Sequence, residues 1–191
     1  DKKAPFISIP QGSLLTVAFI TFFASLGEGA VADWSGIFLI SVLSIGEGSA
    51  ALGYTLFSIC MFAMRLVGDR ISFKFGPSKT ARYSGLVALI GSIILLTFES
   101  LLPLLIGFSL IGLGIAVIIP LAFSRAGNDK NMSQGTAIAS IATLGYGGML
   151  IGPLFVGFIA EITSIKTSFF ILPILSLLIF LLSKSLSVKS H

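Results

Sequence analysis

Two carboxylic acids, Glu28 and Asp33, lie in the otherwise apolar stretch "ASLGEGAVADWSGIFL" at residues 24–39. Inside a membrane an ionisable side chain costs about 2.5–3.5 kcal/mol on insertion scales, so it should face protein or water. Burial disfavours the charged form of a carboxyl group, and the glycines on both sides of Glu28 predict an interrupted helix whose freed backbone groups could bind a ligand. We therefore expect Glu28 to bind a substrate or carry a proton. The alternative is a structural acid held by hydroxyl groups or water.

The sequence offers few partners for Glu28. We expect no lysine or arginine at its depth, so the acid should be protonated, hydrogen-bonded or paired with a group outside the chain. Tyr54 and Tyr146 are candidate hydroxyl partners if their segments converge on Glu28. Asp33 and Trp34 have two interpretations. They lie among the lipid headgroups, which tryptophan favours, or they join the same site if the helix continues to residue 39.

The elements that must hold these residues are transmembrane helices. Only 10% of the 191 residues are charged, whereas soluble domains have about 25%, and the mean hydropathy is +1.05. A helix needs ~20 apolar residues to cross the bilayer core, and the chain has six apolar runs that suffice. They are too long and too continuously apolar for barrel strands. We therefore predict an all-α membrane protein with six helices, at roughly 13–39, 49–67, 82–98, 101–123, 135–160 and 167–184.

The basic residues predict the orientation of these helices. Lysine and arginine gather in cytoplasmic connections, and of the twelve in the chain only Lys166 falls on the other side of the predicted bundle. Both termini are therefore expected in the cytoplasm. Because the basic residues form short clusters between apolar runs, the net charge of +4 does not indicate a nucleic-acid partner. The predicted cytoplasmic set is Lys2, Lys3, Arg65, Arg70, Lys74, Lys79, Arg82, Arg125, Lys130, Lys184 and Lys189, with Arg125 interpreted as a topological anchor.

Glycine content predicts which helices lie inside the bundle. Gly148, Gly152 and Gly157, with Pro153 among them, would let helices approach closely. The first, second, fourth and fifth segments are expected to form the interior, whereas the third and sixth should face lipid. The tripeptide "LGY" at 52–54 and again at 144–146 suits a three-plus-three inverted repeat.

The most specific local pattern is "RLVGDRISFKFGPSK" at residues 65–79. We expect a helix to leave the membrane at Arg65 and Gly68 to permit close packing. Asp69 and Arg70 should form an opposed charge pair at headgroup level. Gly76 and the proline after it predict a turn, so a short loop would couple two helices rigidly.

This pattern resembles the glycine–aspartate–arginine loop motif of the major facilitator superfamily, which joins the second and third helices of each six-helix half. The matching residues are Gly68, Asp69, Arg70, Lys74 and Gly76, although Met64 stands where many members have glycine. Three stretches resemble the seventh, tenth and eleventh helices of bacterial members: "EGAVADWSGIFL" (28–39), "GLGIAVIIPLAFSRAG" (112–127) and "ATLGYGGMLIGPLFVGFIAEITS" (142–164). The chain is therefore similar to the C-terminal half of a twelve-helix transporter, and we expect it to be part of a longer protein.

The resemblance implies a secondary transporter that moves a small solute by alternating access against an N-terminal half, in a bacterial inner membrane. In the family, the first and fourth helices of each half line the central cavity, so Glu28, Ser25 and Ser109 would face the substrate. The motif's aspartate meets a helix end of the opposite half when the cytoplasmic side is closed. Asp69 and Arg70 would therefore form a gating latch, since an anion near a helix N-terminus gains about 0.3–1 kcal/mol. The alternative is that the basic residues only set topology.

Other functions find less support in the sequence. The only histidine is the terminal His191, and neither H-E-x-x-H nor G-x-x-x-x-G-K-[ST] occurs. We therefore expect no enzymatic activity, metal or cofactor, and the remaining alternatives are a channel or a non-transporting receptor on a transporter scaffold. The expected site has an acid, hydroxyls and aromatic rings but no deep cation. This argues against an anionic substrate bound by this half alone and leaves sugars, small polar metabolites and cationic amphiphiles.

Overall fold

The structure, a computed structural model, describes residue 10 and residues 12–187. Six helices or helix pairs are long and apolar enough to cross a membrane, and the described residues contain no strand, so the predicted all-α class is confirmed. Lys2, Lys3, Lys189 and His191 lie outside the described residues. The elements are α1 (Ser13–Leu43), α2 (Glu47–Phe75), α3 (Pro77–Thr97), α4 (Leu101–Ile115), α5 (Ile118–Gly127), α6 (Gln134–Ile162), α7 (Ile165–Ser168), α8 (Ile171–Leu182) and the 3-10 helix η1 (Ser183–Leu186).

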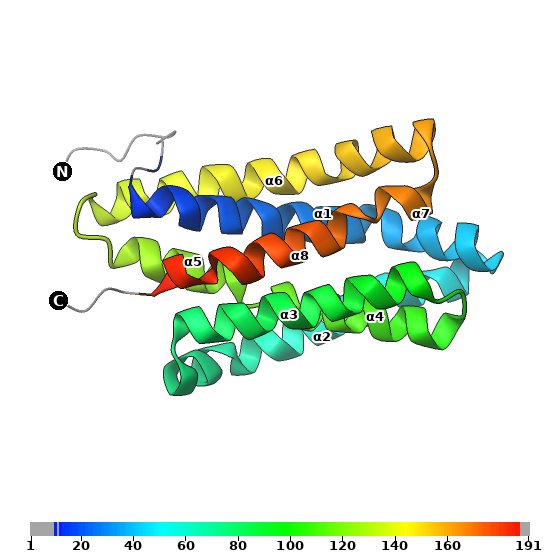
Figure 1. The fold of residues 1–191 in the computed structure, drawn as a ribbon, viewed down its shortest axis with the longest axis horizontal. Helices are drawn as coiled ribbons and strands as arrows, with labels where there is room; N and C mark the ends of the chain where they lie inside the picture. Colours follow the sequence, from blue (N-terminus) through cyan, green and yellow to red (C-terminus); the bar gives the residue numbers. More distant parts are fainter. Residues whose placement is uncertain (1–9, 11, 188–191) are drawn as a thin grey trace.

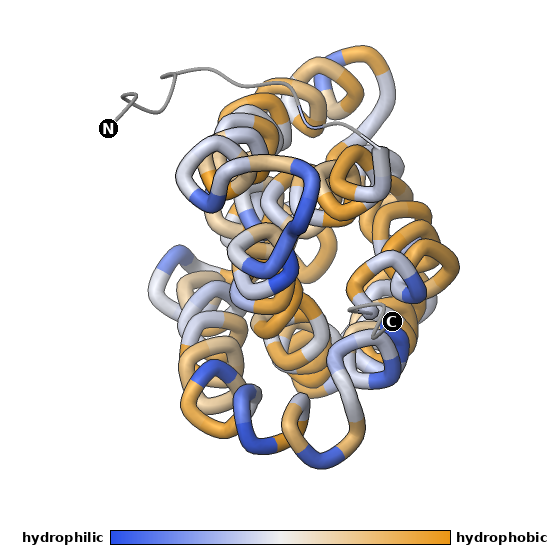
Figure 2. The backbone as a smooth tube through the Cα atoms, turned by 90° about the vertical axis from the view of Figure 1, so that its left-hand side faces the viewer, coloured by the Kyte–Doolittle hydropathy of each residue, from blue (hydrophilic) through white to orange (hydrophobic). Residues whose placement is uncertain are grey.

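The crossings run back and forth, so both ends of the described chain lie at the same end of the bundle (Figure 1). We name this the basic end, because it carries the connections between α2 and α3 and between α5 and α6, with their lysines and arginines. Seen from the basic end, the connections nearest the viewer are hydrophilic and the helices behind them are hydrophobic (Figure 2). Lys166 lies at the opposite end, where Nζ donates to Glu99 Oε1 at 2.5 Å. This hydrogen bond and charge lower the pKa of the Glu99 carboxyl.

Two helices differ from the predicted boundaries in ways that affect the site. α1 continues without a break from Ser13 to Leu43, so the interruption predicted at the glycines beside Glu28 is wrong. α2 continues to Phe75 rather than ending near residue 67, so Arg65 lies well inside the helix and not at its end. The turn to α3 is the single residue Gly76, whose φ of 86° suits glycine, followed by the first helical residue Pro77.

The fourth crossing contains the break that the first lacks. α4 ends at Ile115 and α5 begins at Ile118. Pro120 has no backbone N–H, so it cannot donate to the carbonyl of Ala116 four residues before it. The backbone group freed by this break is an acceptor beside α2.

The arrangement of the crossings has the predicted internal repeat. α1 packs extensively on α6, and α2 packs extensively on α4. Exchanging the first three crossings with the last three turns the first crossing (α1) into the fourth (α4 and α5), and the fifth (α6) into the second (α2). The pair of α1 with α6 is therefore equivalent to the pair of α4 with α2. The pairs α3 with α4 and α8 with α1 are related in the same way. A three-plus-three repeat therefore accounts for the main helix contacts.

Burial corrects the predicted interior. The first and fourth crossings are the most buried, with 67% and 56% of their most apolar windows covered. The second and fifth were also predicted to be inside, but they are the least buried, at 22% and 28%. Glycine in α6 serves contact with α1 on one face only, and the other faces of α2 and α6 stay uncovered in the described chain.

The predicted close approach at the α6 glycines is confirmed. A Cβ atom placed on Gly148 would collide with the backbone carbonyl oxygen of Phe22, and one on Gly152 with that of Leu26. A Cβ on Gly157 would lie 2.8 Å from the Trp34 ring. Gly148 and Gly152 therefore let α6 lie directly on the backbone of α1, and Gly157 leaves room for the Trp34 ring.

Candidate functional site

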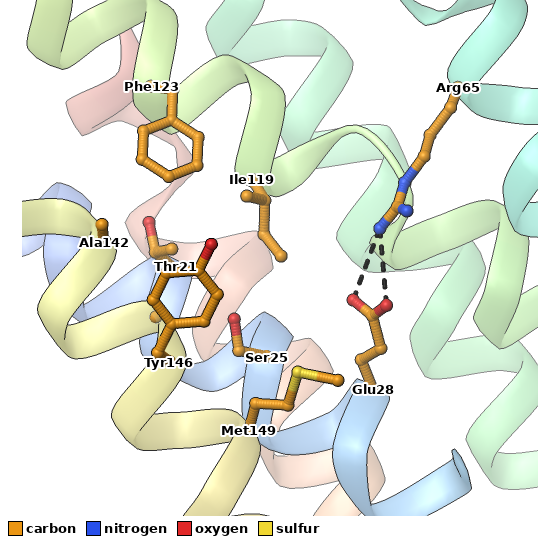
Figure 3. A pocket seen from close by; sticks show the side chains of 10 residues that line it. Thr21, Ser25, Glu28, Arg65, Ile119, Phe123, Ala142, Tyr146 and Met149 are labelled. Carbon is orange, nitrogen blue, oxygen red and sulfur yellow. Dashed lines mark hydrogen bonds and ion pairs between the residues drawn. The ribbon is translucent and has the colours of Figure 1, made fainter. Parts of the chain in front are cut away.

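A pocket of about 270 Å³ opens where α1, α2, α5 and α6 face one another (Figure 3). Glu28 lies at the centre of the uninterrupted α1, midway between Ser13 and Leu43. The pocket contains two charged side chains, and the rest of its lining is hydroxyl, aromatic and aliphatic. The lining residues are Thr21, Ser25, Glu28, Arg65, Ile119, Phe123, Ala142, Gly145, Tyr146 and Met149.

Glu28 is paired with Arg65, which corrects the prediction that no basic residue lies at its depth. Arg65 Nη2 donates to both carboxylate oxygens of Glu28, at 3.5 Å to Oε1 and 3.4 Å to Oε2. The prediction failed because α2 remains helical beyond Arg65, which lies about ten residues, or roughly 15 Å, before the end of α2. Arg65 therefore reaches the same level as the centre of α1.

The helix break in the fourth crossing positions Arg65. Its Nε donates to the carbonyl oxygen of Ala116 at 3.4 Å, the group that Pro120 leaves without a helical donor. One guanidinium thereby contacts α1 through Glu28 and the α4–α5 junction through Ala116, while its own backbone belongs to α2. Three crossings meet at this side chain.

The remaining walls combine hydroxyl groups with apolar surface. The side chains of Ser25 and Tyr146 point into the pocket, from α1 and α6 respectively (Figure 3). The Thr21 hydroxyl instead donates to the Val17 carbonyl at 2.9 Å, so its methyl group is left for packing. Phe123 of α5 and Met149 of α6 supply the apolar part of the lining. The pocket can therefore hold a small polar group beside an apolar body.

Four of the predicted site residues lie outside this pocket. Asp33 is exposed beyond it on α1. Trp34 instead links two helices, because its Nε1 donates to the Pro153 carbonyl of α6 at 3.0 Å. Tyr54 is largely exposed and stacks near Phe57, and the Ser109 hydroxyl donates to the Leu105 carbonyl within α4. The structure thus brings together Glu28, Ser25 and Tyr146 and separates them from these four.

The motif residues lie on a helix rather than in a loop. Arg65, Gly68, Asp69, Arg70 and Lys74 all belong to α2. Gly68 packs closely as predicted, since a Cβ there would lie 2.6 Å from Val117 Cγ1. The predicted pair between Asp69 and Arg70 is absent from the ion pairs of the described chain. Successive helical residues point about 100° apart, so the two side chains diverge.

Asp69 lines a second hollow at the basic end. This groove has a volume of about 440 Å³ and is bounded by the end of α2, the start of α3 and α5. Asp69 is exposed there, and no described residue forms a hydrogen bond with its carboxylate. The groove is lined by Asp69, Ser72, Phe73, Gly76, Pro77, Pro120, Leu121 and Ser124.

Arg125 is more than an anchor facing the headgroups. Its Nη1 pairs with Asp129 at 3.1 Å, and its Nη2 donates to the Ser13 hydroxyl at 3.0 Å. The Asp129 side chain is only 3% exposed. Arg125 therefore fastens the end of α5 to the first residue of α1.

The pocket residues missed by sequence reasoning had little local signal. Thr21, Ile119, Phe123 and Met149 have the composition of any apolar helix. Arg65 did have a signal, because no proline occurs between it and Gly76. A helix drawn to Phe75 would have placed this arginine inside the membrane.

Relatives in sequence define the class of the chain. A scan against protein-family models finds no match. The uncharacterized transporter y4wD of Sinorhizobium fredii is 39% identical over 175 residues, which are 92% of this chain and 46% of that protein. An uncharacterized MFS-type transporter of Yersinia pestis is 38% identical over 165 residues, covering 86% of this chain and 43% of the relative. The chain spans under half the length of these relatives, and it is a multi-pass integral membrane protein built like part of a transporter.

Solved structures share its fold. The E. coli fucose:proton symporter FucP aligns with a TM-score of 0.79 at 21% identity, over 94% of this chain and 44% of that one. An auto-inhibited peptide transporter of the POT family aligns with a TM-score of 0.79 at 19% identity, over 94% and 38%. At such low identity these matches show the fold alone. Together with the relatives in sequence, they show that the chain belongs to the major facilitator superfamily, and its six helices form one half of a twelve-helix bundle.

Proposed function

We propose that this chain is the C-terminal half of a secondary active transporter, which moves a small solute by alternating access against an N-terminal half. The membrane is proposed to be a bacterial inner membrane, with the basic end in the cytoplasm. Support comes from the family, from the sorting of lysine and arginine, and from the open faces of α2 and α6. Because an opposite half would be needed to complete the substrate path, the chain alone is not expected to transport.

The Glu28–Arg65 pair carries the proposal. An acid and a base at mid-membrane, in a pocket rather than in lipid, are typical of a substrate or proton pathway. We propose that Glu28 accepts a proton in one step of the cycle. Protonation removes the carboxylate's charge and releases Arg65, so the proton favours whichever state lacks the pair. Of the described pocket residues, Arg65 on α2 and the Tyr146 phenol on α6 are the other ionisable groups that face Glu28.

Uptake by the full-length transporter in liposomes tests this role, with Glu28→Gln compared against wild type. Labelled sugars, polyols, amino acids and carboxylates serve as the solute panel, with an inward proton gradient imposed. We expect the gradient to drive accumulation in wild type but only equilibration in Glu28→Gln, while labelled-solute exchange continues in both. Glu161→Gln, at the exposed end of α6, is the matched control and should behave as wild type. Full gradient-driven accumulation by Glu28→Gln would exclude the proton role. An absence of exchange in wild type would favour a channel or receptor.

A further inference from the structure

We propose that Arg65 binds a carboxylate group of the transported solute, and that Glu28 and the solute compete for this one guanidinium. The inference rests on the proposed transport function and specifies its substrate class as small organic anions with an apolar body. It also reverses the sequence-based argument against anions, whose premise was that the site has no deep cation.

The Arg65 guanidinium is held in place, but only some of its donors are used. Its Nε is fixed by the Ala116 carbonyl, and a single nitrogen, Nη2, serves both oxygens of Glu28. Charge-assisted hydrogen bonds are commonly about 2.7–2.9 Å long, whereas these are 3.4 and 3.5 Å. Nη1 donates to no described residue. The side chain therefore keeps donors for a second planar acceptor, and a carboxylate matches the fork that two guanidinium nitrogens present.

The two charges of the pair are unequally exposed. The Arg65 side chain is 41% exposed and that of Glu28 is 20% exposed, so the cation is the more accessible of the two charges. No other residue in the pocket lining is an acid or a base of the Asp, Glu, Lys or Arg type. When Glu28 takes up a proton, one positive charge is left unpaired in the pocket, and an anion can neutralise it.

The other pocket residues suit the rest of such a solute. Ser25 and Tyr146 offer hydroxyl groups near the pair, and Phe123 and Met149 offer apolar surface (Figure 3). At about 270 Å³ the pocket suits a small molecule, with further volume to come from the opposite half. A carboxylate on Arg65 and an aliphatic or aromatic body against α5 and α6 would use every wall.

The exchange needs no covalent change. Glu28 gains a proton and becomes neutral, the ion pair with Arg65 opens, and the solute carboxylate takes the place of the Glu28 carboxylate. One proton and one anionic charge enter together, so the charge of the occupied pocket matches that of the empty pocket. Return of the proton to solvent restores the pair and expels the anion. Proton and solute are thus coupled through one side chain.

Ligand-dependent thermal stabilisation of the purified full-length protein tests the inference without requiring transport. The probes are acetate, benzoate and phenylacetate, each paired with its neutral amide: acetamide, benzamide and phenylacetamide. We expect a carboxylate to stabilise Glu28→Gln at about tenfold lower concentration than wild type, equivalent to about 1.4 kcal/mol, because the internal competitor is gone. The matching amide should not stabilise it, and Arg65→Gln should remove the effect. Arg82→Gln, on the exposed face of α3, is the control and should retain wild-type binding.

The inference is overturned if no carboxylate stabilises Glu28→Gln more than its amide, or if Arg65→Gln keeps the preference for the acid. If Arg65→Gln does not yield folded protein, the comparison of acids with amides on Glu28→Gln decides the matter by itself. Carboxylate binding without uptake would contradict the transport function but leave this site intact. Uptake that is confined to neutral solutes and unchanged in Arg65→Gln would support the transport function but contradict the carboxylate site at Arg65.

Discussion

At the scale of single residues, Arg65 decides how the pocket is organised. The guanidinium satisfies a carbonyl freed by Pro120 and a carboxylate on α1. Each of these groups would be costly if left alone in a low-dielectric environment. A cation that serves two such groups at once is held by both, and neither bond is short. This combination of fixed position and weak pairing suits a charge that must change partners.

The glycines of α6 give the sharpest prediction for one residue. In Gly152→Ala the new Cβ would meet the backbone carbonyl oxygen of Leu26, which cannot move aside without shifting α1. We expect a loss of about 1–3 kcal/mol, typical of overpacking, read as a lower midpoint of thermal unfolding. Gly147→Ala is the matched control, because nothing lies within 4 Å of a Cβ there, and it should be neutral or slightly stabilising. Equal midpoints for the two variants would contradict close packing of α1 on α6.

At the scale of elements, the position of the helix break matters more than the presence of glycine. Gly27 and Gly29 lie within a continuous α1, where small size lets neighbours approach: Leu172 and Leu175 against Gly27, and the Met149 carbonyl against Gly29. The break occurs instead between α4 and α5, before Pro120. Glycine lowers helix stability, but proline removes a donor, so only proline forces a free carbonyl.

The end of α2 carries the proposed latch. Asp69 lies exposed in the groove at the basic end and forms no hydrogen bond with a described residue, so its carboxylate is available to a helix N-terminus of the opposite half. We expect Asp69→Asn in the full-length protein to slow solute exchange by about two- to fivefold, on the order of the 0.3–1 kcal/mol that such a contact supplies. Its level in the membrane should not change.

A second variant distinguishes a role of the motif in gating from a role in membrane orientation. Lys74→Gln, one turn further along α2, also removes a charge from the basic end, but it leaves Asp69 in place. It should have a smaller effect on exchange than Asp69→Asn. An exchange rate unaffected by Asp69→Asn would reduce the motif to a role in membrane orientation.

At the scale of the whole molecule, the exposed faces indicate where the missing half would lie. α2 and α6 flank the pocket, and both carry large apolar side chains that nothing in the described chain covers. On α6 these include Leu150 and Leu154, which are 73% and 74% exposed. We infer that these faces meet the opposite half, whereas the outer face of α8 meets lipid.

Spin labels can distinguish the two kinds of face. In a Cys60→Ala background, a nitroxide at Leu154→Cys should be mobile in the isolated half in nanodiscs and immobilised in the full-length protein. A label at Ile174→Cys on α8, also exposed, should be equally mobile in both. Equal mobility of the Leu154 label in the two samples would place the interface between halves elsewhere.

The sequence by itself determined the class, the number of crossings and three members of the pocket, whereas it assigned two crossings too many to the interior. These follow from local quantities: the length of apolar runs, the sorting of basic residues and the rarity of acids in lipid. Glu28 could be identified as a candidate site residue from its type alone, because an acid within an apolar transmembrane segment is costly and is usually functional. Gly76 could be identified as a turn, because the proline after it cannot continue the preceding helix.

Only the tertiary structure decided what Glu28 contacts. The sequence places Arg65 where its helix leaves the membrane and offers Glu28 no basic partner. These two residues are 37 positions apart, so their contact can be predicted only when the register between α1 and α2 is known. That register depends on how α2 packs on its neighbours, including the close approach of Gly68 to Val117 at the α4–α5 junction. The same holds for Trp34, whose bond to Pro153 requires α6 to lie against α1. Chain composition limits which groups exist at a given depth, but the packing of helices decides which of them face each other.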